Sequence, residues 1–194
     1  MEGLVQIDQQ LTLWINGLDI PALFPVWRVF SKVALWFPIY ALVMGFLIWR
    51  LGWKKGLVVV LSLILCVVLT DQLANLVKNS VCRPRPCHTP WMLEHGLVLP
   101  DGIAGGPYGF FSGHAANCFG FAMASWLGFR KNDQPHAYKA YGWVVFMWAG
   151  LVAVSRIMMG AHYLGDVLVG AAFGLLVGLV MAYAAHGILV KAKL

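Results

Sequence analysis

The chain has 194 residues, of which 60% are hydrophobic and only 11% are charged, and its mean hydropathy is +0.75. Charged residues make up about a quarter of an ordinary soluble domain, so this composition excludes that class and indicates an integral membrane protein. The net charge of +6 does not point to nucleic acid, because basic cytoplasmic loops of a membrane protein give the same total. We expect one membrane-embedded domain, residues 1–194, that binds no nucleic acid.

The first predicted element is a short amphipathic helix within residues 1–20. Its apolar residues recur at helical spacing, and polar residues occupy most of the other positions; the apolar set is Leu4, Ile7, Leu11, Trp14, Ile15 and Leu18. The segment is too short and too polar to span a bilayer, so we expect it to lie in the membrane interface.

Five apolar runs follow, at about residues 33–49, 56–77, 111–129, 140–154 and 163–190. They predict an all-α fold, a polytopic transmembrane bundle of about five spanning helices. In the last run, Gly170, Gly174 and Gly178 recur every four residues and predict a smooth face for close helix packing. The longest polar break, residues 78–110, is rich in proline and glycine, and we expect an extracytoplasmic lid or lipid-access loop.

The positions of the basic residues predict the topology. One side of the bundle would carry Arg50, Lys54, Lys55, Arg130, Lys131, Lys139, Lys191 and Lys193, and the other Arg28, Lys32, Lys78, Arg83, Arg85 and Arg156. The positive-inside rule makes the first side cytoplasmic. We therefore expect a multi-pass protein of the cytoplasmic (inner) membrane. Its second side would face the periplasm or exterior, with Lys78, Arg83, Arg85 and Arg156 kept there to bind phosphate.

A cluster of ionisable residues interrupts the apolar sequence at residues 155–166, where such groups are costly and often functional. His162 and Asp166 would lie one helical turn apart, so the carboxylate could orient the imidazole as a nucleophile. Arg156 could grip phosphate oxygens with its planar guanidinium. The alternative is a structural, buried His–Asp pair with an arginine that reaches towards water.

Two further polar stretches flank the long loop. Lys78 and Arg85 stand at the end of the second run, where they would present two cations held apart by a turn stiffened by proline. At the start of the third run, Ser112, Gly113 and His114 combine a hydroxyl, a close backbone approach and a proton donor at a helix N-terminus. The alternatives are a basic stop at the membrane boundary and an ordinary N-cap serine beside an interfacial histidine.

Other polar residues are given structural roles. Asp71 and Asn75 share a helical face with Lys78 and would form a polar seam that supports it. Cys82 and Cys87 flank the Arg-Pro-Arg-Pro segment of the loop, and the sequence leaves open whether they form a disulfide. A metal pair is disfavoured, because their spacing is loose and no second pair follows.

Together, the three polar stretches resemble the type 2 phosphatidic acid phosphatase family. The family pattern is a lysine, six residues and Arg-Pro; then Pro-Ser-Gly-His; then Ser-Arg, five residues, a histidine, three residues and an aspartate. The matching residues are Lys78, Arg85, Pro86, Ser112, Gly113, His114, Ser155, Arg156, His162 and Asp166, and Phe111 stands where the family has proline.

The resemblance implies a reaction and a role for each residue. His162 would attack phosphorus and become a phosphohistidine, Asp166 would orient it, and His114 would protonate the leaving group and then activate water. The phosphate would be held by Lys78, Arg85, Ser112, Gly113 and Arg156. No metal and no other cofactor is implied, because fixed cations would balance the phosphate charge.

The expected function is that of a lipid phosphatase at the outer leaflet, with undecaprenyl pyrophosphate as the first choice of substrate. Lipid A and phosphatidylglycerophosphate or phosphatidate are alternatives, because the motifs bind phosphate and not the lipid.

Vanadium haloperoxidases share such a site but are soluble. A lipid phosphotransferase would move the phosphate to another lipid instead of to water, and only a product assay distinguishes it from a phosphatase. An anion transporter would need polar residues continuing to the cytoplasmic side, and beyond Asp71 and Asn75 there are few. The sequence leaves the oligomeric state open.

Overall fold

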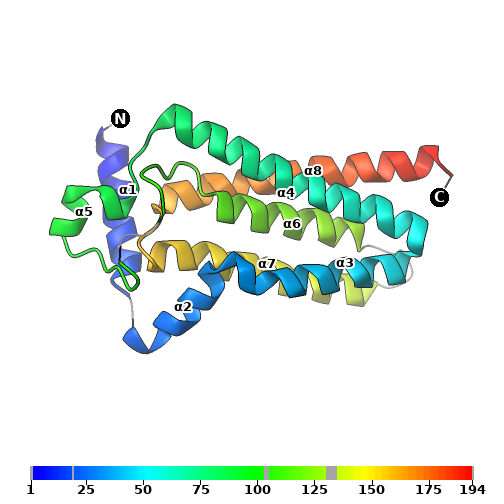
Figure 1. Cartoon of the computed structure of the whole chain (residues 1–194), viewed down its shortest axis with the longest axis horizontal. Coiled ribbons are helices and arrows are strands. Elements are labelled where there is room, and N and C mark those ends of the chain that lie inside the picture. The colour runs from blue at the N-terminus through cyan, green and yellow to red at the C-terminus, as the bar shows by residue number, and fades with distance from the viewer. Residues whose placement is uncertain (1, 19, 103–104, 130–134, 194) are drawn as a thin grey trace.

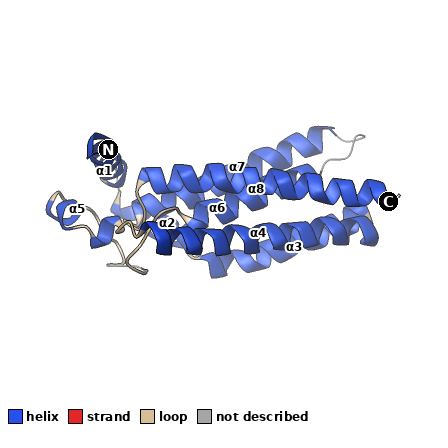
Figure 2. Ribbon diagram, turned by 90° about the horizontal axis from the view of Figure 1, so that it is seen from above, coloured by secondary structure: helices blue, strands red, loops and turns tan. Residues whose placement is uncertain are grey.

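A computed structural model describes residues 2–18, 20–102, 105–129 and 135–193. Its helices are α1 (Glu2–Asn16), η1 (Pro21–Leu23), α2 (Phe24–Ser31), η2 (Val33–Trp36), α3 (Phe37–Leu51), α4 (Trp53–Val81), η3 (Pro86–His88), α5 (Pro90–Glu94), α6 (Gly113–Gly128), α7 (Pro135–Met158) and α8 (Leu164–Lys191). Within these ranges there is no strand, only an isolated bridge between Pro84 and Tyr108 (Figure 2). The predicted all-α fold is confirmed.

The bundle consists of helices α3, α4, α6, α7 and α8, which run along one axis (Figure 1). Four segments of the described chain are long and apolar enough to cross a membrane: Val33–Leu51, Trp53–Val81, Tyr138–Met158 and Leu164–Lys191. The fifth, α6, has 16 residues and a length of about 24 Å, which is less than the roughly 30 Å of a hydrocarbon core. Helix α6 packs against α4, α7 and α8, so it is the inner helix of the bundle.

The glycine face predicted on the last helix forms the contact between α8 and α6. A Cβ atom placed on Gly174 would lie only 2.2 Å from the carbonyl oxygen of Ala116, and one on Gly178 would lie 2.5 Å from that of Gly120. No larger residue fits this separation without moving a backbone. Small residues allow such close backbone approach in a membrane, where apolar surface alone does not drive helices together.

Helix α1 crosses one end of the bundle, beside α5 (Figure 1). Its apolar side points outwards, since Leu4 is 74% and Trp14 65% exposed, whereas Thr12 and Asn16 are completely buried. The amphipathic helix predicted from the sequence is therefore present, with its polar side turned towards the protein. We call this end of the molecule the site end.

The long loop also lies at the site end, and it begins later than predicted. Helix α4 continues to Val81, so Lys78 belongs to its last turn, and Cys82 ends the helix with a left-handed backbone (φ +51°). The following segment packs inwards, because Met92 and Leu97 form a small buried cluster with Tyr163. In the described part of the chain no disulfide joins any of the four cysteines; Cys82 is exposed and Cys87 is buried.

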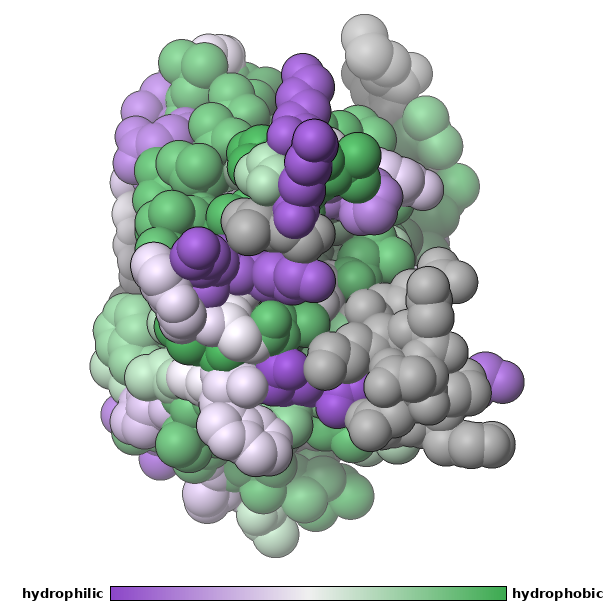
Figure 3. Space-filling view, turned by 90° about the vertical axis from the view of Figure 1, so that its right-hand side faces the viewer, coloured by the Kyte–Doolittle hydropathy of each residue, from purple (hydrophilic) through white to green (hydrophobic). Residues whose placement is uncertain are grey.

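The opposite end of the bundle carries basic residues at the helix termini. Arg50 lies in the last turn of α3, Lys54 and Lys55 lie in the first turn of α4, and Lys191 is the last residue of α8. Figure 3 faces this end and shows strongly hydrophilic side chains gathered among apolar ones. Arg130 and Lys131, which the sequence placed on the same side, lie outside the described residues.

Candidate active site

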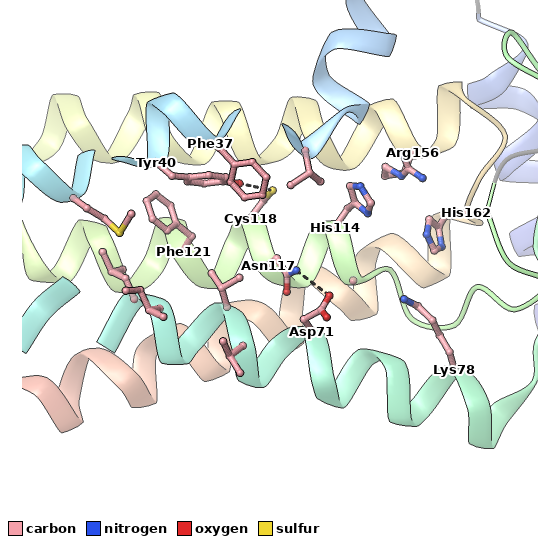
Figure 4. A pocket seen from close by; sticks show the side chains of 18 of the residues that line it. Phe37, Tyr40, Asp71, Lys78, His114, Asn117, Cys118, Phe121, Arg156 and His162 are labelled. Carbon is pink, nitrogen blue, oxygen red and sulfur yellow. Dashed lines mark hydrogen bonds between the residues drawn. The ribbon is translucent and has the colours of Figure 1, made fainter. Parts of the chain in front are cut away.

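Residues from five separate segments meet in one cavity of about 540 Å³ near the site end. The predicted residues in its lining come from the last turn of α4, the long loop, the start of α6, the end of α7 and the connection between α7 and α8; these residues are Lys78, Arg85, Gly113, His114, Arg156 and His162. Asp71 and Asn117 also line the cavity. Figure 4 shows the side chains of Lys78, His114, Arg156 and His162 grouped at one end of the cavity. The structure thus brings together six of the eight predicted site residues along its wall.

The other two predicted residues lie behind this wall. Asp166 is completely buried in the first turn of α8, and its Oδ2 atom lies 3.5 Å from Nδ1 of His162, which is itself 1% exposed. This separation is longer than a hydrogen bond, as is common in catalytic pairs without substrate. Gly109 passes close by, since a Cβ placed on it would lie 3.1 Å from Asp166 Oδ2 and 3.5 Å from His162 Nδ1.

Ser112 takes the structural role that the sequence left open as an alternative. It is fully buried as the N-cap of α6, where its hydroxyl accepts a hydrogen bond from the Ala115 amide (3.4 Å), and its own amide donates to the Asp166 carbonyl (2.9 Å). It is not among the residues that line the cavity in the described chain. A direct contact between Ser112 and phosphate therefore stays a prediction.

The two arginines of the cavity are held by hydrogen bonds to neighbouring segments. Arg85 donates from Nε to the Tyr108 carbonyl (3.1 Å) and from Nη1 to the Ala161 carbonyl (3.4 Å). Arg156 is 8% exposed and donates from Nη1 to Ser31 of α2. Its Nε has no hydrogen-bond partner among the described residues. A buried donor of this kind is available to an anion in the cavity.

The polar seam on α4 is present and extends to α6. Lys78 Nζ lies 3.5 Å from the Asn75 Oδ1 atom, and Asn75 donates to Asp71 Oδ2 (3.2 Å). The Asp71 Oδ1 atom accepts a further bond from Asn117 (3.4 Å), the contact drawn in Figure 4. A Cβ placed on Gly113 would lie 3.3 Å from Lys78 Nζ, so the glycine lets the ammonium group approach the N-terminus of α6.

The electrostatics of the cavity keep the imidazole of His162 neutral. Burial, followed by the charges of Arg156, Arg85 and Lys78, lowers the pKa of His162 well below its ordinary value of about 6.5. A neutral imidazole retains the lone pair that a nucleophile or base needs. The same cations would stabilise an anionic group placed beside it.

Beyond the charged group and the neighbouring Asp71 and Asn117, the cavity is apolar. This part lies between α3, α4 and α6 and is lined by Val33, Phe37, Tyr40, Met44, Leu63, Ile64, Val67, Val68, Cys118 and Phe121. In Figure 4, Phe37, Tyr40 and Phe121 stand at the far end from His162. The cavity therefore combines an anion-binding end with an apolar end, which is the arrangement that a lipid phosphate requires.

The structure corrects the role of one residue and adds another that sequence reasoning missed. Arg83 was grouped with the phosphate-binding cations, but its side chain forms ion pairs with Asp166 and with Asp8 of α1. Asp8 lies 75 residues from Arg83 in the chain. No spacing rule connects two residues so far apart, and the only signal for Asp8 was its place on the polar side of a surface helix.

Among the described residues, no group of three or more His, Cys, Asp or Glu side chains could hold a metal ion.

The fold and the cavity together define a polytopic helical membrane protein with a site built for a phosphate group attached to an apolar molecule. Residues 56–188 match the PAP2 superfamily, and the chain belongs to this family. It is a membrane-bound lipid phosphatase. The resemblance seen in the three polar stretches is thereby confirmed at the level of the family.

Similar proteins support this assignment. The chain is 31% identical over 190 residues to a lipid A 4'-phosphatase of Bacteroides thetaiotaomicron, covering 96% of this chain and 80% of that protein. It is also 31% identical over 179 residues to a lipid A 4'-phosphatase of Porphyromonas gingivalis, covering 92% and 72%. The crystal structure of a PAP2-type phosphatidylglycerolphosphate phosphatase from Bacillus subtilis superposes with a TM-score of 0.72 at 19% identity, covering 98% of this chain and 88% of that one; this likeness concerns the fold.

Proposed function

We propose that the chain removes a phosphate from lipid A, at the 4' position, through a phosphohistidine intermediate. The observation that supports the reaction is the cavity itself, in which Lys78, Arg85, Arg156 and two histidines surround one end and apolar side chains line the other end. The similarity to two lipid A 4'-phosphatases along almost the whole chain favours lipid A over undecaprenyl pyrophosphate, which the sequence alone had placed first.

In the first step, the unprotonated Nε2 of His162 attacks phosphorus, so that a P–N bond forms while the bond to the sugar oxygen breaks. His114 gives a proton to that oxygen, and the dephosphorylated lipid leaves as an alcohol. Asp166 accepts a hydrogen bond from the Nδ1–H group of His162, which keeps its proton, and stabilises the positive charge that develops on the ring. Three cations, Lys78, Arg85 and Arg156, balance the charge on the phosphoryl oxygens.

In the second step, His114 takes a proton from water, and the resulting hydroxide attacks phosphorus. The P–N bond breaks, its electrons return to the imidazole of His162, and inorganic phosphate leaves. Both histidines are then in the protonation states in which they act in the next cycle: a proton on His114 and a free Nε2 on His162. The whole chain, residues 1–194, acts in this proposal as one unit.

The orientation in the membrane is also part of the proposal. The basic helix termini at the end opposite the site favour the cytoplasm, so the site end would face the periplasm, at the outer leaflet of the inner membrane. The outward apolar face of α1 would then rest among the head groups, beside the lipid whose phosphate enters the cavity. The acyl chains would lie along the apolar part of the cavity between α3, α4 and α6.

The test is phosphate release by the purified protein in detergent, from lipid A, undecaprenyl pyrophosphate, phosphatidylglycerophosphate and phosphatidate, in the presence of EDTA. We expect lipid A to be the best substrate, with loss of the 4'-phosphate in the mass spectrum and no activity in His162→Ala. Preferred release from another lipid would overturn the substrate, and phosphate found on a second lipid would indicate transfer in place of hydrolysis. A metal requirement that EDTA exposes would overturn the mechanism.

A further inference from the structure

The carboxylate behind His162 is itself held by a bridge that reaches the surface helix. Arg83 donates from Nη1 to Asp166 Oδ1 (2.7 Å) and from Nη2 to Asp8 Oδ2 (2.7 Å), so its guanidinium joins two carboxylates. The other oxygen of Asp166 accepts the Tyr163 amide (3.2 Å) and faces Nδ1 of His162. Each oxygen of the Asp166 carboxylate therefore has a fixed orientation.

Arg83 is kept in place by more than its two ion pairs. Its guanidinium lies over the ring of Tyr163, 4.0 Å from the ring centre, and its carbonyl oxygen accepts the Gly109 amide (2.9 Å). The ring of Tyr163 is in turn fixed by a hydrogen bond between its hydroxyl and that of Thr89 (2.8 Å). A planar guanidinium stacked on an aromatic ring and bonded at both ends is pre-organised in a way that lysine is not.

Polar side chains of helix α1 accept hydrogen bonds from backbone amides in the first turn of α8. Asp8 Oδ1 accepts the amide of Gly165 (2.8 Å), and the hydroxyl of Thr12 accepts the amide of Leu164 (2.9 Å). These amides belong to the first turn of a helix, where no intrahelical acceptor is available. One turn further on, Asn16 donates to the carbonyl of Ile157 (3.1 Å) at the end of α7. Helix α1 thus binds both sides of the connection that carries His162.

A buried carboxylate needs such a partner. Asp166 is completely buried, and an unpaired charge in this position would either take up a proton or turn towards another donor. In both cases Nδ1 of His162 would lose the acceptor that keeps its proton there and leaves Nε2 free to react. Neither Arg83 nor Asp8 lines the cavity in the described chain, so they act on the chemistry through Asp166.

We propose that Arg83 is a positioning residue of the reaction, and that Asp8 of helix α1 holds it, so that the two together fix the Asp166 carboxylate behind His162. This inference rests on the proposed function. It makes α1 part of the active site, although none of its described residues lines the cavity.

The experiment compares kcat and KM for lipid A in the full chain and in the variants Arg83→Ala, Arg83→Lys, Asp8→Asn and the double variant Asp8→Asn/Arg83→Ala. We expect kcat to fall on the order of 10–100-fold in Arg83→Ala, as for other groups that orient a catalytic side chain. KM should change less than about threefold, because Arg83 does not touch substrate. Asp8→Asn should have a smaller effect that disappears in the Arg83→Ala background, because both residues act through one carboxylate.

Two further measurements separate positioning from a general loss of structure. Guanidinium ion added to Arg83→Ala should restore part of kcat, since the side-chain site is 22% exposed, and it should restore nothing in His162→Ala. The matched control is Arg28→Ala, which breaks an arginine–aspartate pair with Asp101 outside the site and should leave kcat within about twofold. If Arg83→Ala does not fold, Arg83→Lys and Asp8→Asn carry the comparison.

A kcat within about twofold of wild type in Arg83→Ala, while His162→Ala is inactive, would overturn the inference and leave the proposed function standing. If the wild-type chain released no phosphate from any lipid, the proposed function would fall. The positioning role would then be decided by nitrogen NMR of the His162 ring. An Nδ1-protonated tautomer that is lost in Arg83→Ala supports positioning, and an unchanged tautomer overturns it.

Discussion

The two ends of the bundle both carry several basic residues, but they place them differently. At the end opposite the site, Lys54, Lys55 and Lys191 are exposed at helix termini. At the site end, Arg83, Arg85 and Arg156 are drawn inwards and arranged around a buried histidine and a buried aspartate. Exposed charges at a helix end cost little free energy and influence the orientation of a protein in the membrane. Buried cations carry a large desolvation cost and need anionic partners, in the protein or in the substrate.

The largest expected effect at the site end is that of removing the nucleophile. His162→Ala should reduce phosphate release from lipid A by about 10⁴-fold or more, since no phosphohistidine can form. His186→Ala is the matched control, because His186 is an exposed histidine of α8 near the other end. Equal losses in the two variants, measured as phosphate released per minute, would remove the distinction between the ends.

The next effect concerns the cations. Arg156→Ala should lower kcat by roughly 10²–10³-fold, because a fixed donor for the phosphoryl oxygens is lost. Lys55→Ala, at the opposite end, should change kcat by less than about twofold. A rate for Arg156→Ala close to wild type would mean that this guanidinium serves only to bind Ser31 and α2.

A smaller effect is expected on stability from the packing of α8, which connects the two ends. Gly174→Ala would place a Cβ 2.2 Å from the Ala116 carbonyl oxygen, and we expect it to lower the free energy of unfolding by about 1–3 kcal/mol. Gly187→Ala, later in the same helix, meets nothing within 4 Å and should be neutral. Thermal unfolding followed by tryptophan fluorescence in detergent measures both, and similar melting temperatures would argue against tight packing of α6 on α8.

The smallest effect is a pH dependence of stability. In the unfolded chain, His162 binds a proton below about pH 6.5. In the folded protein, burial and then the charges of Arg156, Arg85 and Lys78 lower the pKa of His162 well below that value. His114 and Asp166 also face the His162 ring. Since the unfolded state binds more protons in this window, stability should fall as pH falls, by up to about 1.4 kcal/mol per pH unit. His162→Gln should weaken this slope between pH 6.5 and 5, and an unchanged slope would assign it to other groups.

The sequence was most informative where a local pattern carries the physics. Hydrophobic runs long enough for a bilayer predicted the helices, and the glycines at every fourth position of α8 predicted its contact face. The three polar stretches predicted the residues that line the cavity, with Asp166 behind His162. Each of these signals depends on residues that are neighbours along the chain or on one helical face.

The sequence by itself therefore determined the membrane class, the helices and the chemical groups of the site. Only the tertiary structure decided that Arg83 bonds to Asp166 over 83 residues of chain, that Asp8 and Thr12 cap α8 from another helix, and that Ser112 is buried as an N-cap. The physical reason is that a buried charge or an unpaired amide takes whichever partner the packing brings within reach. Composition and spacing specify which groups need partners, and the packing of distant segments specifies which partners they receive.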